Sequence, residues 1–453
     1  MQKALMICCL IAVHVAQAGI ISEITCEGNK RTKPHIIARE LTFQVGDTLP
    51  FENYEKDCIQ SKNNILNTSL FNFCTVEFCD SLEFTKVKIK VTERWYIWPE
   101  IILKFQERNF TEWLKNRNLS RIDYGLYVSH LNFRGRQEKL QIQLKNGFNQ
   151  KIGLLYQIPY LTKSMKAGLS IGVSYNTQNE VFTGIDSLNK MLYTKNSDDV
   201  LMENISVHAE YTRRNDLYSR HFLMADYRDL RLKNELRELN NEFLIGENKL
   251  RFITLTYLFK NDRRDSKNYP LNGSYADVEI KQNGIGIDQS NLNISSISTN
   301  YRSYHFMASR LYFAFGAYAK AFSSPNVPFY LQDGLGFNHY VRSYEPYIIN
   351  GQLSTVGKAQ LKFQVLKPKV HKIPFIKTEK FSKIHYAIFS NLFVDAGYVH
   401  NNFNKQRRLD NEFLLGVGIG LDFVTFYDLV WRYEYSINKY LEHGLYISFV
   451  API

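Results

Sequence analysis

Long hydrophobic runs are almost absent from this sequence. One apolar run, from Ala4 to Val15, lies near the N-terminus, and no later run approaches the ~20 residues that a membrane-spanning helix needs. This excludes a protein that crosses a membrane with several helices. Cysteine is also scarce, with 6 residues among 453 and none after Cys79, so any disulfide is confined to the N-terminal segment.

Spacings typical of metal sites and phosphate-binding loops are missing as well. The 11 histidines show no metal-ligand pattern, no Cys/His spacing resembles a zinc site, and no phosphate loop is present. Scattered carboxylates do not by themselves make an acid–base pair. We therefore predict that the chain is not an enzyme and uses no metal or cofactor.

The N-terminal apolar run is typical of a secretory signal peptide. Lys3 precedes it and Ala16-Gln17-Ala18 supplies small residues for cleavage, so residues 1–18 are the predicted signal. The run is too short for the alternative, an N-terminal membrane helix. The cysteines that remain after cleavage are either disulfide partners or small buried side chains. They are Cys26, Cys58, Cys74 and Cys79.

Aromatic residues and positive charge are abundant. Aromatics make up 14% of the chain, with 29 Tyr and 31 Phe, while the mean hydropathy is −0.30. Such a chain suits a large β-protein. The net charge is +12. Export removes the chain from nucleic acid, so we predict no nucleic-acid partner and a solvated basic surface, with contact to acidic membrane lipid as the weaker alternative.

Residues 19–93 are predicted to form a small α+β domain. Strands are expected at 20–27, 71–78 and 86–91, and Val87, Ile89 and Val91 alternate with lysines in the last of them. Helices are expected after Thr32 and over 52–67. The next segment, 94–120, begins with Trp- and Tyr-rich sequence, which favours either a membrane–water boundary or an apolar plug at a domain junction.

From residue 121 to 453 the chain becomes a series of ~10-residue alternating segments separated by polar turns. In 415–423, for example, Leu, Val, Ile, Leu and Phe alternate with Gly416, Gly418, Gly420 and Asp422. A soluble sandwich also alternates, but large aromatic outward faces and an amphipathic last strand favour a membrane barrel. We expect about sixteen strands: 122–133, 137–147, 150–160, 167–175, 188–195, 204–214, 217–227, 249–260, 272–283, 293–305, 308–320, 355–367, 385–398, 411–423, 425–436 and 443–452.

The order of elements in 19–93, with EGNKRTKPHIIARELTFQVGD at its front, resembles the POTRA domain, a periplasmic module that precedes outer-membrane barrels. The resemblance implies that an extended partner chain pairs with an exposed sheet edge. A purely structural module is the alternative.

Three further motifs make the whole chain similar to the BamA/TamA family, also called bacterial surface antigen D15 proteins. Val341-Arg342-Ser343-Tyr344 resembles the Val-Arg-Gly-aromatic signature of a loop that folds back into the barrel lumen, with Ser343 where glycine is usual. Phe393-Val394-Asp395-Ala396-Gly397 resembles the Phe-x-Asp-x-Gly motif of the thirteenth strand. The turn motif comprises Asp262, Arg264, Asp265, Pro270 and Gly273, and a solvated charged turn is its alternative reading.

The resemblance implies a sixteen-stranded antiparallel transmembrane barrel in which Asp395 receives Arg342 and pins the loop. Alternation alone places Asp395 on the lumen face, and an ordinary lumen salt bridge is the alternative. The family's second acid would lie near Lys362, so it is either absent or supplied from elsewhere, for instance by Glu434 or Asp422. We further hypothesise that the loop packs against Gly416, Gly418 and Gly420, rather than these glycines merely filling a narrow lumen.

The resemblance implies an outer-membrane protein of a Gram-negative bacterium with its POTRA domain in the periplasm. The leading prediction is a factor that assembles or inserts outer-membrane proteins, with unfolded polypeptides, outer-membrane lipid and accessory lipoproteins as partners. A weakly paired seam between strands 122–133 and 443–452 would open, and Gly444, Phe449 and Pro452 belong to its last strand. The alternatives are a protein-secretion or solute pore of the two-partner-secretion type, and a passive structural barrel.

Overall fold

A computed structural model describes residues 18–81, 84–105, 122–162, 164, 166–196, 199–244, 246–285, 292–372, 383–402, 407–425 and 429–450. Residues 1–17 of the predicted signal peptide and Pro452 lie outside these ranges. The chain divides into two compact units, Met1–Arg94 and Trp95–Ile453. No helix in the described ranges is long and apolar enough to cross a membrane.

The N-terminal unit is a four-stranded sheet with two helices. The sheet has the order β2-β1-β4-β3, with β1 and β4 parallel and the other pairs antiparallel. Its elements are β1 (Ala18–Glu27), α1 (Pro34–Ala38), β2 (Thr48–Pro50), η1 (Phe51–Asn53), α2 (Tyr54–Asn67), β3 (Phe71–Ser81) and β4 (Phe84–Glu93). The alternation predicted for residues 86–91 is present, because Val87 and Ile89 are buried and the lysines between them are not. The four cysteines are unbonded thiols.

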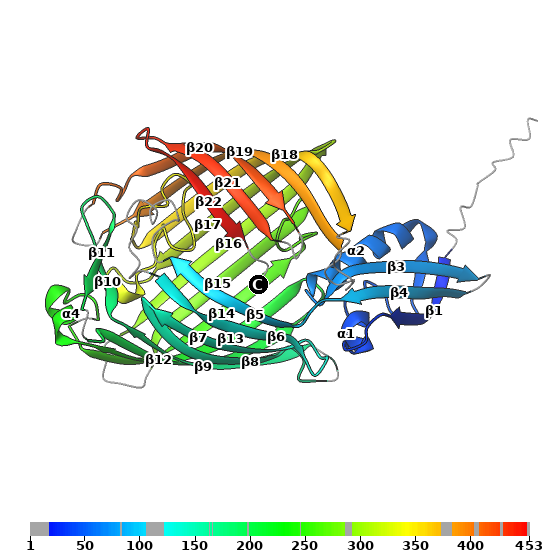
Figure 1. The fold of residues 1–453 in the computed structure, drawn as a ribbon, viewed down its shortest axis with the longest axis horizontal. Coiled ribbons are helices and arrows are strands. Elements are labelled where there is room, and N and C mark those ends of the chain that lie inside the picture. Colours follow the sequence, from blue (N-terminus) through cyan, green and yellow to red (C-terminus); the bar gives the residue numbers. More distant parts are fainter. Residues whose placement is uncertain are drawn as a thin grey trace, which may run out of the picture. The chain divides into compact units, whose positions relative to one another are not determined.

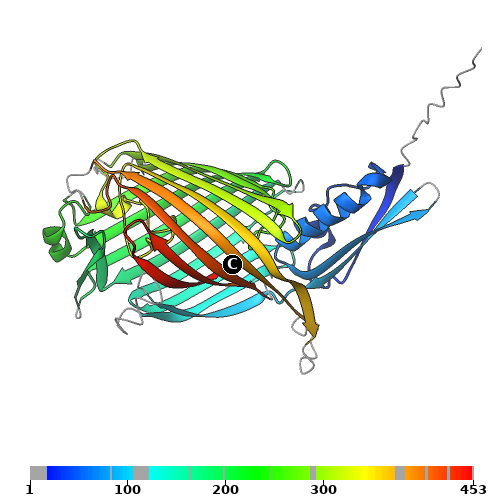
Figure 2. The same ribbon diagram turned by 90° about the horizontal axis from the view of Figure 1, so that it is seen from above.

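The second unit is a sixteen-stranded antiparallel sheet that curls into a barrel (Figures 1 and 2). The strands are β5 (Ile97–Phe105), β6 (Ile122–Phe133), β7 (Glu138–Gly147), β8 (Asn149–Ile158), β9 (Ala167–Gln178), β12 (Met202–Arg214), β13 (Ser219–Leu232), β14 (Lys249–Asp262), β15 (Gly273–Ile285), β16 (Ile294–Ala308), β17 (Leu311–Phe322), β18 (Leu353–Lys372), β19 (Lys383–His400), β20 (Phe413–Val424), β21 (Val430–Asn438) and β22 (His443–Val450). Each pairs with its neighbours in chain order, except that β9 pairs with β12 across an inserted hairpin. The predicted mostly β fold with sixteen antiparallel strands is confirmed.

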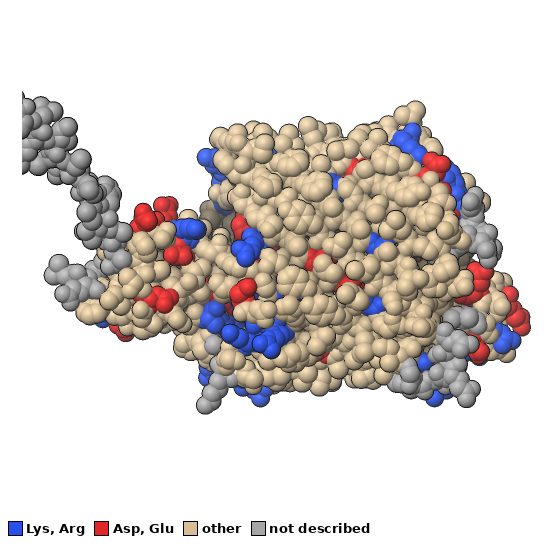
Figure 3. All heavy atoms as spheres, turned by 180° about the vertical axis from the view of Figure 1, so that it is seen from behind, with Lys and Arg blue, Asp and Glu red and all other residues tan. Residues whose placement is uncertain are grey.

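The alternation of side chains separates an apolar outer face from a polar lumen. On β20, Leu415, Val417 and Ile419 are exposed, while Asp422 on the opposite face is fully buried. Figure 3 shows the consequence on one outer side of the barrel, where charged residues gather toward the ends and only scattered charges interrupt the broad band between them. Strands of period two produce such a band, because lipid accepts only apolar outward side chains.

The predicted list of strands needs two corrections, because it misses one barrel strand and includes one that lies outside the barrel sheet. The first barrel strand is β5, within the segment predicted to be a junction, and the predicted strand 188–195 overlaps β11 (Met191–Lys195). β11 pairs with β10 (Glu180–Ile185) in a separate hairpin. The two errors cancel in the strand count. Pro99 lies within β5, and because β5 is the last strand on one side of the sheet, it tolerates a proline that lacks an N–H.

The seam is therefore not at 122–133. Across the described ranges, β5 pairs with β6 alone and β22 pairs with β21 alone, so the backbone ladder ends at these two strands. Gly444 pairs with Ser436 and Phe449 pairs with Trp431. Gly444 thus lies within the ladder between β22 and β21.

Candidate functional site

The segment between β17 and β18, residues 323–352, packs among the inward-facing side chains of the barrel. It contains a short 3₁₀ helix, η3 (Phe329–Leu331), and an antiparallel bridge joins Leu335 to Ile349. Val341 and Tyr344 are buried in one apolar cluster with Val356 on β18 and Val399 on β19. This segment, which we call the lumen loop, therefore has a core of its own against the barrel wall.

Arg342 docks on Asp395 through a bidentate ion pair. Its Nε donates to Asp395 Oδ2 at 2.8 Å and its Nη2 donates to Oδ1 at 2.6 Å. The backbone N–H of Arg342 also donates to Oδ2, at 3.1 Å. Arg342 is 6% exposed and Asp395 is fully buried. A planar guanidinium on a carboxylate fixes orientation as well as position, so the pair defines where the loop tip sits.

Glu434 supplies the second acid. Arg342 Nη1 donates to Glu434 Oε1 at 3.0 Å. Glu434 lies on β21, whereas the acid expected near Lys362 would lie on β18. The guanidinium also lies over the Phe393 ring, with 3.6 Å from Cζ to the centroid. Of the two acids named from the sequence, Asp422 is engaged elsewhere, because Arg432 donates to it at 2.8 Å. One arginine is thus held by two carboxylates and one aromatic face from two strands, β19 and β21.

Ser343 adopts the left-handed backbone conformation that glycine would favour, with φ of 75°. For a residue with a Cβ this conformation is strained. Polar contacts compensate, since Ser343 Oγ donates to the Glu442 carbonyl at 3.2 Å and Asn438 Nδ2 donates to the Ser343 carbonyl at 3.3 Å. The serine in place of glycine therefore keeps the backbone turn and attaches it to the β21–β22 connection.

Two glycines allow the loop to approach the wall closely. A Cβ at Gly416 would lie 2.0 Å from the Arg342 carbonyl oxygen, and one at Gly397 would lie 2.5 Å from Val341 Cγ2. Gly418 instead faces the Phe393 ring, and Gly420 faces the Asn391 side chain. The hypothesis that the loop packs on all three glycines of β20 is wrong for the latter two and right for Gly416, and the sequence reading overlooked Gly397 as a second contact.

The turn motif at residues 262–273 forms a separate anchor. Arg264 Nε and Nη2 each donate to a carboxylate oxygen of Asp262 at 2.8 Å, and Asp265 accepts backbone N–H groups of the turn. Gly273 has φ of 99° where β15 begins. Beside Pro270, Tyr269 is buried and its hydroxyl donates to Asp422 Oδ2 at 2.8 Å. The motif is therefore more than a solvated turn, because it fastens this turn to β20, a role that the sequence reading did not give to Tyr269.

The chain also contains one Gly-x-Ser-x-Gly pentapeptide, Gly168–Gly172, which the sequence reading overlooked. In hydrolases such a serine sits on a sharp turn between a strand and a helix. Here Ser170 lies inside β9, paired with Gln157 on one side and Glu210 on the other. The pentapeptide therefore belongs to the barrel wall and forms no nucleophile elbow.

These features define a class of protein, a sixteen-stranded barrel with an inward-folded loop held by an Arg–Asp–Glu cluster. The sequence of residues 132–426 matches the Omp85 superfamily domain. Since this is more than half of the chain, the protein belongs to the Omp85 superfamily, in agreement with the BamA/TamA resemblance.

Solved structures agree at the level of the fold. BamA from Haemophilus ducreyi lacking POTRA domains 1-3 is 16% identical, with a TM-score of 0.55, over 95% of this chain and 84% of that chain. CdiB from Escherichia coli is 11% identical, with a TM-score of 0.58, over 96% of this chain and 76% of that chain. No curated protein matches the sequence at a significant level.

Proposed function

We propose that this protein handles unfolded polypeptides at the outer membrane of a Gram-negative bacterium, and that its principal activity is to insert client strands into that membrane. The observation that carries the proposal is the end of the backbone ladder at β5 and β22 in the described part of the barrel. A strand with unpaired N–H and C=O groups is a template for another chain. Superfamily membership supports the same class of activity.

Within the described residues, the two strands at this seam are shorter than the longest strands of the barrel. β5 has 9 residues and β22 has 8, whereas β18 has 20 and β19 has 18. A short edge offers few hydrogen bonds to hold the barrel shut. The seam between β5 and β22 is therefore the place where a client strand enters with the least disruption.

The N-terminal unit acts, in this proposal, as a periplasmic POTRA domain that receives clients. Its sheet ends on one side at the three-residue β2 and on the other at the eleven-residue β3, which pairs only with β4 among the described strands. A long open edge suits β-augmentation, in which main-chain hydrogen bonds supply affinity and leave sequence largely free. Accessory lipoproteins complete the proposed set of partners.

A secretion pore for one dedicated polypeptide is the second candidate. The lumen loop favours it, because a loop buried inside the barrel and pinned by Arg342 would act as a plug that moves during transport. Both candidates use unfolded protein as substrate. They differ in whether the client leaves through the seam into lipid or through the lumen.

Depletion of the protein distinguishes the two. Loss of many outer-membrane proteins supports the insertion factor, whereas loss of a single exported polypeptide with an unchanged outer membrane supports the pore.

A disulfide across the seam between β5 and β22 provides a second test. One cysteine in β5 and one in β22, in a background without the native cysteines, should abolish client insertion in reconstituted membranes until reduced. The matched control joins Val128 to Ile142, a registered pair of β6 and β7. Insertion that continues with the seam locked would contradict the gating model.

A further inference from the structure

A cavity of about 530 Å³ lies inside the barrel beside the lumen loop. Inward-facing residues of β16, β17, β18 and β21 form its wall, and the turn at 267–270 and residues 338–342 of the loop complete it. The charged side chains that line the cavity are mostly positive. Seven lysine or arginine side chains line it among the described residues, against one carboxylate, that of Glu434.

Most of these cations are neutralised by carboxylates in or behind the wall. Arg342 pairs with Asp395 and Glu434, Arg432 with Asp422, and Arg264 with Asp262. Lys358 Nζ lies 3.6 Å from Asp395 Oδ2, a carboxylate already occupied by Arg342. These carboxylates are thus paired with Arg342, Arg432 and Arg264. The remaining positive side chains face the cavity.

Lys362 is a buried cation that forms no ion pair in the described structure. It is 4% exposed, and within the described ranges no carboxylate lies within 4.0 Å of its Nζ. Its contacts are aromatic, with Nζ 4.2 Å from the Tyr269 centroid and 5.9 Å from that of Tyr304. A cation–π contact contributes roughly 0.5–2 kcal/mol, whereas burying an ammonium group costs several kcal/mol. The rings alone do not balance the charge.

Neighbouring donors line the same cavity. Lys358, Gln360 and Lys362 alternate along β18 and line the cavity together, and Gln360 Nε2 is buried without a hydrogen-bond partner. Across β17, Lys358 is opposite Gly316, which in turn is opposite Arg302 on β16. Arg302 contacts Asn300 and the Tyr275 ring, and in the described structure it pairs with no carboxylate.

The floor of the cavity is built from small residues. Ala314 and Gly316 are the β17 residues that separate Arg302 from the polar row on β18. At Gly316 the nearest atoms to a built Cβ are 3.8 Å away, so a small side chain there would make only ordinary contacts. The cationic side chains of β18 and Arg302 of β16 therefore lie on either side of these small β17 residues and are not direct neighbours.

We propose that this cavity is a binding site for a phosphate-type oxyanion, held by Lys362, Arg302 and Gln360. A tetrahedral dianion accepts several charge-assisted hydrogen bonds at once and supplies the negative charge that Lys362 lacks. The volume is large enough to admit an inorganic phosphate or a phosphomonoester group. Such a group has two sources, a free ion that enters through the lumen and a lipid headgroup that enters through the seam. The site does not depend on which of the two polypeptide-handling functions is correct.

Thermal unfolding of the full-length protein in detergent tests the site, with inorganic phosphate compared against chloride at equal ionic strength. Phosphate should raise the Tm of the wild type, and a ³¹P titration should give a Kd that Lys362→Met weakens at least tenfold. Ala314→Leu keeps every charge but fills the floor, and it should weaken binding to a similar degree. Heat-modified gel mobility shows that each variant is folded.

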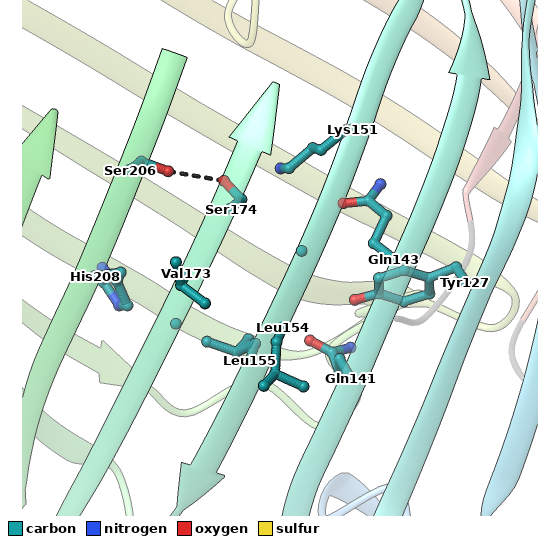
Figure 4. Close-up of a pocket in the computed structure, with 12 residues that line it drawn as sticks. Tyr127, Gln141, Gln143, Lys151, Leu154, Leu155, Val173, Ser174, Ser206 and His208 are labelled. Carbon is teal, nitrogen blue, oxygen red and sulfur yellow. Dashed lines mark hydrogen bonds between the residues drawn. The ribbon is translucent and has the colours of Figure 1, made fainter. Parts of the chain in front are cut away.

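Lys151→Met is the matched control. Lys151 projects from the inner wall of the barrel, where it lines a different recess of about 270 Å³ beside Ser174 and Ser206 (Figure 4). It carries the same charge but lies outside the proposed site, so its loss should leave the Kd unchanged.

Dihexanoyl phosphatidate in place of inorganic phosphate separates the two sources. A Tm rise with inorganic phosphate assigns the site to a free ion, and a rise with the lipid alone assigns it to a headgroup. Equal phosphate binding by the wild type and Lys362→Met, or by the wild type and Ala314→Leu, would overturn the proposal. So would a wild type whose Tm rises neither with inorganic phosphate, relative to chloride, nor with dihexanoyl phosphatidate.

Discussion

Arg342 and Asp395 are 53 positions apart in the chain, yet three N–H groups of Arg342 donate to the two carboxylate oxygens of Asp395. The pair fastens the tip of the lumen loop to β19, and Glu434 holds the same guanidinium from β21. Because both the side chain and the backbone of Arg342 are engaged, the contact determines the path of the loop as well as its charge balance.

Asp395→Asn should release the lumen loop. Removal of one charge leaves a largely buried arginine with a single remaining carboxylate, and breaking a buried pair costs about 3–5 kcal/mol, with the lower end expected in a partly wet lumen. Limited proteolysis should then cut within residues 336–346, and single-channel conductance should rise. The control, Lys439→Gln, breaks the more exposed pair with Glu412 and should cost less than about 1 kcal/mol. A loop in Asp395→Asn that stays as protected as in the wild type would show that the ion pair does not pin it.

Glu434→Gln should have a smaller effect than Asp395→Asn. Glutamine keeps an acceptor for the single Nη1 bond, whereas Asp395 receives three bonds, so a loss of about 1 kcal/mol is expected. Chemical unfolding of both single variants and the double variant measures the coupling. Groups that share one guanidinium should not be additive, and strict additivity would show that Glu434 acts independently of the pin.

Gly416→Ala should displace the loop although it alters no charge. The new Cβ would meet the Arg342 carbonyl oxygen at 2.0 Å, and overpacking of this kind costs about 1–3 kcal/mol. Gly357→Ala is the control, since nothing lies within 4 Å of a Cβ built there. Greater protease sensitivity of the loop in Gly416→Ala, but not in Gly357→Ala, is the expected result. Equal protection in both would place the loop farther from β20.

Tyr269→Phe should loosen the turn at 263–272. It removes the hydrogen bond to Asp422, and bonds to charged groups contribute about 1.5–3 kcal/mol. Tyr312→Phe is the matched control, because the Tyr312 hydroxyl makes no hydrogen bond in the described structure while its ring contacts the same Phe389. Hydrogen exchange of the turn amides should increase only in Tyr269→Phe. A matching increase in Tyr312→Phe would assign the effect to packing.

Thiol reactivity tests the N-terminal unit. Burial raises the pKa of Cys74 to about 12, and the thiolate is the reactive form, so at pH 8 Cys74 is almost entirely protonated and inert. Cys79 is exposed on the same strand. Iodoacetamide at pH 8 should therefore modify Cys79 and spare Cys74 until urea unfolds the unit, as mass spectrometry can follow. Equal labelling rates in the native protein would contradict the burial of Cys74.

Period-two alternation was enough to predict much of the barrel. It placed Asp395, Asp422 and Glu434 on the lumen face, and all three are buried there. It could not find β5, whose apolar run contains Pro99, nor tell that residues 188–195 belong to a hairpin outside the barrel sheet. Both errors arise because a local pattern reports an extended, half-buried segment and not its partner.

By itself, then, the sequence determined which side of each strand meets lipid and which meets the lumen, because that choice depends only on the parity of neighbouring residues. It also identified Arg342 as a charge that needs an acid. Only the tertiary structure decided that Glu434 is the second acid, that Gly416 and Gly397 make room for the loop, and that Lys362 faces a mostly cationic cavity. These relationships depend on the register and order of strands far apart in the chain, which hydrogen bonding across the whole sheet sets and no local pattern contains.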